Sequence, residues 1–328
     1  MKRKPKIIAL YNENPDWPAS DKESSARVMN LLATALDERG YDYRLVKIFD
    51  SLSGLDPFDP REWLVWNWAE ELGGQPWTDA AVAAELERRG FVFTGSSSAA
   101  LILSCDRMKV KQRLREAGLP TLPARVFADP LQAEQWDAFP AIVKGAHQHG
   151  SFGIDSGAIV YNAEQFARRI AFVREALGDE SLAEPFLDSR EFHVTVFGNG
   201  SPEALPPTEY DYSAFADMHD RMFKFQWKFD ETAWGYHAVK LISPSPADDP
   251  QLRERLEQIA VQAYQAMGIA DYGRVDMRML GDEPQVLDVN PNPDIDPISA
   301  LIASAKACGM SYADVVERII GHAVDRMM

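Results

Sequence analysis

VLDVNPNPDIDP, residues 286–297, is the stretch that decides the fold of this chain. It starts as an apolar strand that carries a carboxylate, Asp288, and two residues later an amide, Asn290. Side chains in a strand repeat every two residues, so both polar groups lie on one face. The prolines that follow end the strand in a rigid, polar turn. An otherwise apolar strand that presents an acid and an amide together indicates a chemical role.

A second strand with an acid precedes this stretch. GRVDMRM, residues 273–279, carries Asp276, and the short turn GDEP at 281–284 predicts that the two strands pair. Asp276 then faces Asp288 and Asn290, and two carboxylates with an amide oxygen are hard ligands that suit Mg²⁺. The apolar neighbours indicate burial, and buried like charges repel unless a cation compensates them. A solvated polar face on an edge hairpin is the alternative interpretation.

A glycine-rich loop is the second candidate site. AIVKGAHQHGSFGI, residues 141–154, is a strand that delivers Lys144 to a loop containing Gly145, Gly150 and Gly153. Glycines let backbone N–H groups approach phosphate oxygens, and the lysine adds a positive charge. The lysine precedes the loop, so the motif is not a P-loop, and a hairpin turn with incidental glycines is the alternative. A phosphate-binding loop and a Mg²⁺ site together indicate ATP chemistry.

The first part of the chain alternates strands with helices, which predicts a parallel α/β sheet up to about residue 99. Helices are predicted where apolar residues recur with helical spacing and the pattern ends at glycine. The predicted strands cover 6–11, 41–48, 63–68 and 91–95, and the predicted helices cover 25–40 and 79–90.

The remainder mixes helices with strands that are expected to pair as hairpins. One long helix is predicted over 98–118, and residues 201–245 show no sustained period, which indicates a functional loop or a lid. Other predicted helices cover 163–177, 248–268, 298–310 and 312–325, and the strands near 139–162, 181–197 and 271–290 complete the pattern.

Composition narrows the possible functions and locations. The 328 residues carry a formal net charge of −16, which argues against nucleic acid as a partner. No apolar run reaches the ~18 residues of a membrane span, so no membrane association is expected. The first apolar run is shorter than the roughly 7–15 residues of a signal-peptide core. We therefore expect a cytoplasmic protein.

Six segments, in this order, resemble the ATP-grasp superfamily and specifically the D-alanine:D-alanine ligase family. They are FVFTGSSSAALILSCDRMKVKQRLREAGLPTLPA (91–124), FPAIVKGAHQHGSFGI (139–154), AEPFLDSREFHVTV (183–196), MGIADYGRVDMRM (267–279), VLDVNPNPDIDPIS (286–299) and GMSYADVVERII (309–320). The resemblance implies a mixed α/β and α+β ATP-grasp fold. It implies an N-terminal α/β substrate domain at 1–99, a central ATP-grasp subdomain at 100–182 and a C-terminal subdomain with the metal site at 183–328.

The resemblance also implies cofactors and the residues that bind them. Asp276, Asp288 and Asn290 are implied as ligands of two Mg²⁺ ions, with Mn²⁺ as an alternative metal, that bridge the phosphates of ATP. Asp288 stands where the family more usually has glutamate. The implied nucleotide-binding residues are Lys144, Arg107, Glu184, Phe186, Leu187, Glu191, Ser151 and Gly153. Arg107 replaces a family lysine, and Lys109 and Lys111 are alternatives at this position.

The implied reaction is ATP-dependent ligation of a carboxylate donor to an amine acceptor through an acyl phosphate. Arg274 matches the arginine that stabilises the transferred phosphoryl group. Ser299 matches the serine that holds the acceptor carboxylate, although serine also favours a helix N-cap. Residues 149–153 match the loop over the phosphates, which brings Gly150 and Ser151 to the reacting groups. The implied partners are two small molecules, and a homodimer is expected by resemblance.

The donor half departs from the family pattern. Gly150 and Trp227 replace a serine and a tyrosine of the donor site, and Asp294 replaces a glycine after the turn. Asp21 or Glu23 is the candidate for the acid that holds the donor amine. We therefore expect an amino-acid-like acceptor and a donor other than D-alanine. The alternatives are a D-alanine:D-alanine ligase proper, a phosphotransferase, and a nucleotide-binding regulatory protein without turnover.

Overall fold

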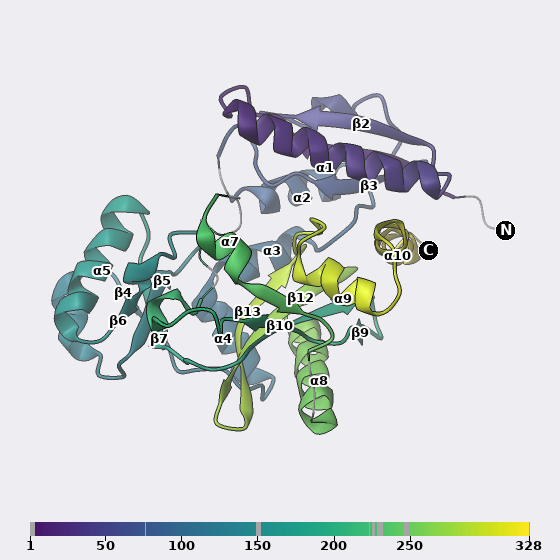
Figure 1. The fold of residues 1–328 in the computed structure, drawn as a ribbon. Coiled ribbons are helices and arrows are strands. Elements are labelled where there is room, and N and C mark those ends of the chain that lie inside the picture. Colours follow the sequence, from purple (N-terminus) through teal and green to yellow (C-terminus); the bar gives the residue numbers. More distant parts are fainter. Residues whose placement is uncertain are drawn as a thin grey trace.

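The computed structural model describes residues 4–75, 77–148, 152–222, 224, 227, 232–245 and 249–327. Within these residues the strands form three separate sheets, one in each of three units of the chain. Figure 1 shows the N-terminal unit above, the central unit to one side, and the C-terminal unit below. The mixed α/β and α+β ATP-grasp architecture expected from the sequence is confirmed by this arrangement and by the similarity to solved structures given below.

The N-terminal unit is a parallel sheet covered on both faces. Its strands are β1 (Lys6–Asn12), β2 (Tyr43–Ile48) and β3 (Trp63–Trp68), in the order β2-β1-β3. Alternate side chains of β1 pack toward helix α1 (Ala19–Glu38) and toward helix α2 (Asp79–Arg88), so the strand is apolar from Ile7 to Leu10. The predicted strand at 91–95 is wrong, because only a single bridge, Val65 with Phe93, forms there.

The predicted helix over 98–118 is two helices, α3 (Ser98–Cys105) and α4 (Arg107–Glu116). Asp106 causes the break: its backbone is extended (φ −96°, ψ 97°) and its carboxylate accepts a hydrogen bond from the N–H of Lys109. Aspartate is a favoured N-cap, so a new helix begins at this point. Arg107 and Lys111 then lie one turn apart on the same side of α4.

The central unit is an antiparallel sheet of β4 (Arg125–Phe127), β7 (Ser181–Pro185), β5 (Ala141–Gly145) and β6 (Ile159–Val160), in that order. Helix α5 (Ala163–Ala176) packs on it through Phe166 and Ile170. The boundary predicted between residues 182 and 183 falls inside β7, and α4 packs against the C-terminal core through Val110 and Leu114. The positions of the three domain boundaries remain predictions.

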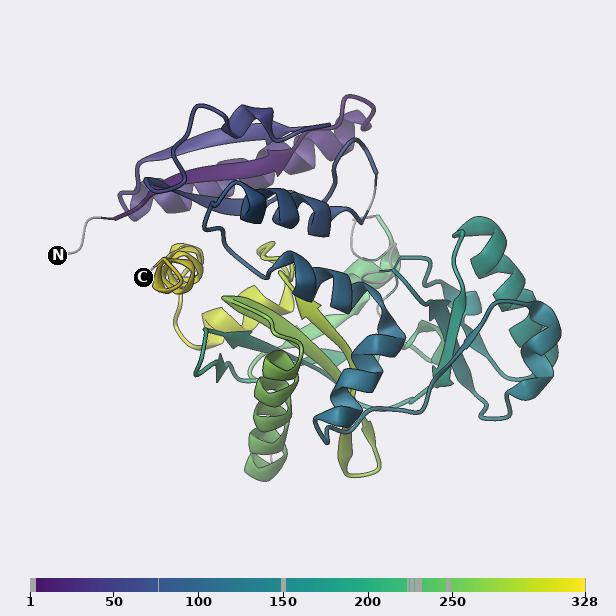
Figure 2. The same ribbon diagram turned by 180° about the vertical axis from the view of Figure 1, so that it is seen from behind.

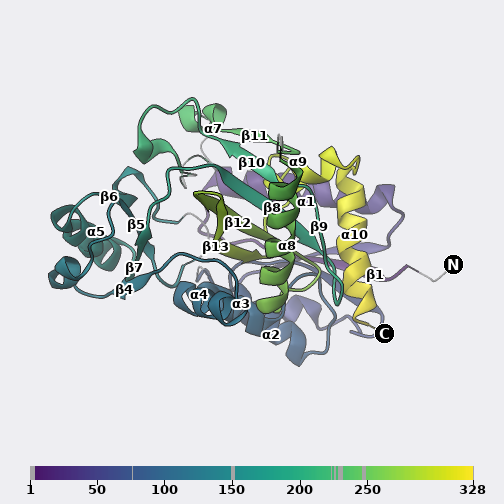
Figure 3. The same ribbon diagram turned by 90° about the horizontal axis from the view of Figure 1, so that it is seen from below.

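The C-terminal unit is an antiparallel sheet with the order β11-β10-β8-β12-β13, and β9 pairs with β8. The three longest strands are β8 (Glu191–Phe197), β12 (Tyr272–Leu280) and β13 (Glu283–Pro291), and β13 lies at the edge of the sheet. Helix α8 (Pro250–Ala266) lies across one face of this sheet (Figure 3), where alternate residues of the strands are apolar and buried. The opposite face carries the polar residues. Helices α9 (Ala300–Ala307) and α10 (Tyr312–Asp325) close the chain.

A register shift in the β12–β13 hairpin changes which residues face the polar side. Asp276 pairs with Asp288, whereas Met277 pairs with Val286, so Leu287 has no partner on β12. A bulge of this kind bends the strand and re-aims side chains. As a result, both Leu287 and Asp288 line the pocket described below.

The sequence predicted an irregular stretch over residues 201–245, but these residues contain several short regular elements. They include β9 (Glu203–Ala204), β10 (Thr208–Asp211), the short helix α7 (Trp234–Ala238) and β11 (Lys240–Ile242). These elements are two to five residues long, too short to show a hydrophobic period.

Hydrogen bonds around a buried ion pair of the C-terminal unit connect it with the N-terminal unit, and both units are seen from behind in Figure 2. The carboxylate of Asp271 is fully buried, accepts a hydrogen bond from Gly95 N (2.8 Å), and pairs with Arg326 Nη2 (2.5 Å). Helix α10 also packs beside α1. In the described part of the chain, no helix has both the length and the apolar composition needed to cross a bilayer.

Candidate functional site

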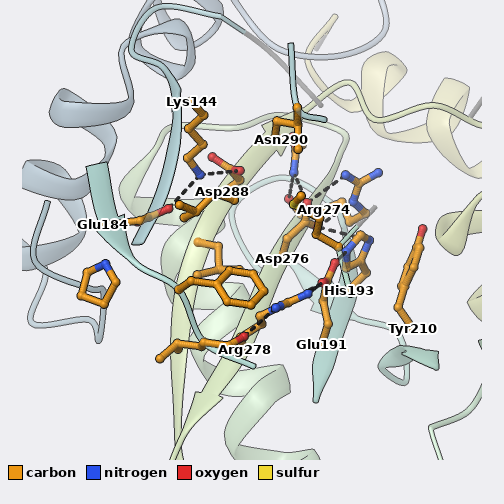
Figure 4. Close-up of a pocket in the computed structure, with 17 residues that line it drawn as sticks. Lys144, Glu184, Glu191, His193, Tyr210, Arg274, Asp276, Arg278, Asp288 and Asn290 are labelled. Carbon is orange, nitrogen blue, oxygen red and sulfur yellow. Dashed lines mark hydrogen bonds and ion pairs between the residues drawn. The ribbon is translucent and has the colours of Figure 1, made fainter. Parts of the chain in front are cut away.

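A pocket lies where the four-stranded sheet meets the polar face of the six-stranded sheet (Figure 4). Strands β5 and β7 supply one wall, and β8, β12 and β13 supply the floor, because alternate residues of these strands point to one side. The lining residues are Ile142, Lys144, Ile154, Glu184, Pro185, Phe186, Leu187, Glu191, His193, Tyr210, Met222, Arg274, Asp276, Arg278, Leu287, Asp288 and Asn290.

Glu184 on β7 is held between two lysines. Its carboxylate lies 2.5 Å from Lys111 Nζ and 2.9 Å from Lys144 Nζ, and all three side chains are at most 5% exposed. Burial raises the pKa of Glu184, but the charges of both lysines outweigh it and leave the pKa below its usual value. The sequence offered Lys111 only as an alternative to Arg107, and the structure gives it a fixed carboxylate partner.

Asp288 on β13 faces a pair of cations. Arg107 forms an ion pair with one carboxylate oxygen, and Lys144 Nζ lies 3.4 Å from the other. Burial of Asp288 raises its pKa, but the positive charges of Arg107, Lys144 and Lys111 bring the pKa well below the usual range. Arg107 also donates to the carbonyl of Gly145 (3.1 Å), which ties the start of α4 to the end of β5.

Asp276 on β12 is bound by Arg274 of the same strand. The two side chains make a bidentate pair, with Nε to Oδ1 at 2.7 Å and Nη2 to Oδ2 at 2.9 Å. Asn290 donates its amide to the same carboxylate at 2.9 Å. Burial lowers the pKa of Arg274, but the charge of Asp276 outweighs it and raises the pKa above its ordinary value.

The predicted metal ligands Asp276, Asp288 and Asn290 therefore lie together, in register, on one face of the hairpin. Two carboxylates and an amide oxygen fit a hard cation such as Mg²⁺. Among the described residues no group of three or more His, Cys, Asp or Glu side chains is arranged to hold a metal. A hard cation of this kind takes more than three ligands, so these three side chains leave coordination positions for a bound molecule.

At the other end of the pocket, Glu191 on β8 is held by two groups that the sequence analysis did not assign. Arg278 Nη2 lies 2.6 Å from Oε2, and His193 Nε2 lies 2.9 Å from Oε1. Burial raises the pKa of Glu191, but the charge of Arg278 and the His193 hydrogen bond lower it to about 2. His193 lies two residues from Glu191 on the same face of β8, whereas the register of β8 with β12 brings Arg278 to it.

Apolar side chains cover the space beside Glu191. Ile142, Phe186, Leu187, Met222 and Leu287 line this part of the pocket. The guanidinium of Arg278 lies 5.0 Å from the Phe186 ring centroid, within the range of a cation–π contact. An apolar slot with a few oriented polar groups suits a planar ring that carries a polar substituent.

A profile of the family described as "D-ala D-ala ligase C-terminus" matches residues 117–321. A D-alanine–D-alanine ligase of Sphingopyxis alaskensis is 30% identical over 328 residues, covering 94% of this chain and 95% of that protein. The chain belongs to the D-alanine–D-alanine ligase family of ATP-grasp proteins.

Two further comparisons give lower sequence identities. An uncharacterized protein, y4sG, of Sinorhizobium fredii is 27% identical and covers 94% of this chain and 90% of its own length. The crystal structure of the D-alanine–D-alanine ligase of Bacillus anthracis complexed with ATP covers 98% of both chains with a TM-score of 0.73. The identity in this comparison is 21%, so the match describes the fold.

The loop that the family resemblance places over the phosphates is only partly described. Gly150 and Ser151 lie outside the described residues. Gly153 has a φ of 70°, and a Cβ there would lie 2.4 Å from Leu177 Cδ1, so only glycine fits. Arg169 donates to its carbonyl at 2.5 Å and anchors this end of the loop.

The predicted acceptor residue and the rebuilt donor residues lie beyond the pocket lining. Ser299 is the N-cap of α9 and accepts from the N–H of Ile302 (3.3 Å). Trp227 is buried in an aromatic cluster that also contains Tyr210 of the pocket wall. The Trp227 ring stacks on the Phe215 ring, with the ring centroids 4.9 Å apart. Asp294 is exposed in the turn after β13. Asp21 and Glu23 are exposed on α1.

Proposed function

We propose that this protein is an ATP- and Mg²⁺-dependent carboxylate–amine ligase that forms an amide bond through an acyl phosphate. One observation carries the proposal. Two strand acids and an amide lie in register beside Arg107, Lys144 and Arg274, at one end of a pocket whose other end is apolar. This is the charge distribution that a Mg²⁺-nucleotide requires.

In the proposed complex, the adenine ring enters the apolar slot beside Phe186 and Leu187, and the ribose binds Glu191. The phosphates extend toward Lys144 and Arg107. The solved relative from Bacillus anthracis with ATP supports this choice of nucleotide. Lys144 is 5% exposed and already lies between Glu184 and Asp288, so its position requires little rearrangement.

Asp276, Asp288 and Asn290 would hold the divalent cation together with the phosphate oxygens. The cation supplies charge neutralisation during phosphoryl transfer. Arg107 and Lys144 compensate the charge of the Asp288 carboxylate, and Arg274 compensates that of Asp276. With a cation held there, Arg107, Lys144 and Arg274 would be free to turn toward the phosphates.

The proposed reaction has two steps. A donor carboxylate oxygen attacks the γ-phosphorus, the bond from that phosphorus to the β–γ bridging oxygen breaks, and ADP leaves. The amine of the acceptor then attacks the acyl carbon, phosphate leaves, and the amine proton ends on the phosphate. Arg274 stabilises the charge on the transferred group, an electrostatic role that is usually the largest contribution in such reactions.

The substrates are proposed to be a carboxylate donor other than D-alanine and an amino-acid-like acceptor. Ser299 at the N-terminus of α9 supports the acceptor, because hydroxyl and backbone N–H groups there favour a carboxylate. Asp294 and Trp227 support a changed donor, because neither preserves the family's donor-site chemistry. A homodimer is proposed by family resemblance.

The test is ADP release from Mg-ATP with D- and L-amino acids and other carboxylates, supplied singly and in pairs, with mass spectrometry of the products. ADP and an amide that appear only with a donor–amine pair support the ligase. ADP formed with a carboxylate alone, without any amine, indicates a phosphotransferase. Tight Mg-ATP binding with no ADP from any pair contradicts the proposal and favours a regulatory protein. D-alanine with D-alanine is included as the family reference.

A further inference from the structure

Arg278, near the end of β12, binds three separate segments that border the apolar end of the pocket. Its guanidinium is directed at Glu191 (Figure 4), and its Nε and Nη2 lie 2.9 and 2.6 Å from Glu191 Oε2. Nη1 donates to the carbonyl of Leu187 and Nη2 donates to the carbonyl of Arg221, each at 2.5 Å. The side chain is 3% exposed, so water has little access to these contacts.

Both carbonyls belong to segments that form the wall of the apolar slot. Leu187 lies in the linker between β7 and β8 and lines the pocket. Arg221 precedes Met222, which also lines the pocket and is 4% exposed. The side chain of Arg221 pairs in turn with Asp188 of the same linker at 2.9 Å. Arg278 therefore holds the slot and its acid in one arrangement.

Aromatic rings fix the guanidinium on its faces. Its central carbon lies 5.0 Å from the ring centroid of Phe186 and 5.6 Å from that of Tyr212. Both distances are within the range of a cation–π contact. Arginine stays charged at any pH at which proteins fold, so these contacts do not depend on a titration.

The two oxygens of the Glu191 carboxylate differ in how many donors they already accept from. Oε2 accepts from Nε and Nη2 of Arg278 and from the hydroxyl of Tyr212 at 3.3 Å. Among the described residues, Oε1 has one contact, with His193 Nε2 at 2.9 Å. A carboxylate offers roughly four acceptor positions, two on each oxygen. Oε2 is therefore filled, whereas Oε1 can accept one more hydrogen bond.

We infer that Arg278 is a positioning residue that occupies Glu191 Oε2 and leaves Oε1 as the oxygen that this carboxylate offers to a ribose. The inference rests on the proposed function, in which Glu191 binds the ribose of the nucleotide. One remaining acceptor position takes one hydroxyl group. Glu191 therefore recognises either the 2′-hydroxyl or the 3′-hydroxyl, but not both, and this recognition depends on Arg278.

The first measurement compares ADP, 2′-deoxy-ADP and 3′-deoxy-ADP on the wild-type protein by isothermal titration calorimetry with Mg²⁺. ADP has no γ-phosphate to transfer, so binding is measured without turnover. One deoxynucleotide is expected to bind about tenfold or more weakly than ADP, and the other within about threefold of ADP, because only one of them loses a hydrogen bond to a charged group.

The second measurement repeats the comparison on Arg278→Lys. Lysine keeps the positive charge but lacks the planar fork that occupies Oε2 and both carbonyls, so Glu191 is no longer held in one orientation. The discriminating deoxynucleotide is then expected to bind within about threefold of ADP, because its missing hydroxyl no longer meets a fixed acceptor. A general loosening of the fold would weaken all three nucleotides by the same factor and leave their ratios unchanged.

Arg190→Lys is the matched control. Arg190 makes a bidentate pair with Glu209, with Nε to Oε1 at 2.7 Å and Nη2 to Oε2 at 2.8 Å, outside the lining of this pocket. Its replacement removes the same kind of contact from the same sheet. The control is expected to keep the nucleotide ratios of the wild type, and chemical denaturation shows that each variant is folded.

The outcomes distinguish this inference from the proposed function. A wild type that binds none of the three nucleotides removes the proposed function, and this inference with it. A wild type that binds ADP, but binds both deoxynucleotides as tightly as ADP or loses the same affinity with each, overturns the inference alone and needs no variant. A folded Arg278→Lys protein with the nucleotide ratios of the wild type also overturns it.

Discussion

Arg274 and Asp276, two residues apart on β12, form a bidentate ion pair in which both carboxylate oxygens are engaged. The proposed phosphoryl-stabilising group and a proposed metal ligand thus neutralise each other. Asp276 cannot offer an unshared oxygen to a cation until Arg274 turns away. Binding of a Mg²⁺-nucleotide is therefore expected to be coupled to release of the arginine toward the reacting phosphate.

Arg274→Lys tests this coupling. Lysine keeps the charge but loses the planar fork, so we expect kcat to fall by about 100-fold or more while KM for ATP changes little. Steady-state ADP release measures both constants. Arg253→Lys on the exposed side of α8 is the control. A variant with normal kcat and a raised KM would instead place Arg274 in ground-state nucleotide binding.

Asp288→Asn tests the metal assignment. Mg²⁺-dependent ADP production is expected to fall by about 100-fold or more, because a catalytic metal supplies several kcal/mol of stabilisation. Removal of the carboxylate also leaves Arg107 and Lys144 with excess positive charge. Metal-free ATP should therefore bind to the variant at least as tightly as it binds to the wild type. Isothermal titration calorimetry measures both affinities.

The control for this substitution is Asp282→Asn, an exposed aspartate in the turn of the same hairpin. It should leave turnover and binding unchanged. Unchanged Mg²⁺-dependent turnover in Asp288→Asn would remove this residue from the metal site.

Lys111→Met tests the buried lysine–glutamate cluster. Lys111 is 1% exposed and lies 2.5 Å from the carboxylate of Glu184, which is equally buried. Removing Lys111 leaves Glu184 with Lys144 as its remaining cation, so we expect a loss of about 1.5–3 kcal/mol in the free energy of unfolding, the contribution of a hydrogen bond to a charged group. Urea denaturation followed by tryptophan fluorescence measures this value.

Lys109→Met is the matched control, because Lys109 lies on the same helix, is 64% exposed and pairs only with Asp106. Its loss should change the free energy of unfolding by less than about 1 kcal/mol. Equal effects for the two lysines would contradict the account of the cluster.

Glu191→Gln tests a pH dependence. In the folded protein the pKa of Glu191 is lowered from 4.5 to about 2, despite burial, by Arg278 and His193. The unfolded chain then binds a proton at higher pH than the folded chain, and the carboxylate contributes stability above about pH 5 that is lost as the pH falls from about 4.5 toward 2. The difference between 4.5 and about 2 corresponds to about 3 kcal/mol at neutral pH.

The free energies of unfolding of the wild type and Glu191→Gln should therefore differ most above pH 5 and converge as the solution is acidified. Denaturant titrations at successive pH values measure the difference. A constant difference from pH 6 to pH 3 would show that Glu191 has an ordinary pKa in the folded protein.

The candidate site was predictable where it depends on strand period and turn length. Asp276, Asp288 and Asn290 share a face because side chains repeat every two residues and the turn between the strands is short. The bulge at Leu287 was not predictable, because it depends on which residues pair across the hairpin. Arg278 was missed as a partner of Glu191 for the same reason, since it lies 87 residues away and only the strand register brings it close.

Helix boundaries show a second limit. The apolar period continues through residues 98–118 and predicts one helix. Asp106 interrupts it because its carboxylate caps the next turn, a local competition that periodicity does not register. This break directs both Arg107 and Lys111 toward the site. Short strands such as β10 are visible only through their pairing with β8.

The most direct test of the central claim follows the oxygen atoms of the donor. The donor carboxylate found in the substrate screen is labelled with ¹⁸O and allowed to react with Mg-ATP and the acceptor amine. Activation through an acyl phosphate transfers one ¹⁸O from the carboxylate to each inorganic phosphate released, which mass spectrometry of the phosphate detects. Amide formation with unlabelled phosphate would contradict the account, because the donor would then have been activated without attacking the γ-phosphorus.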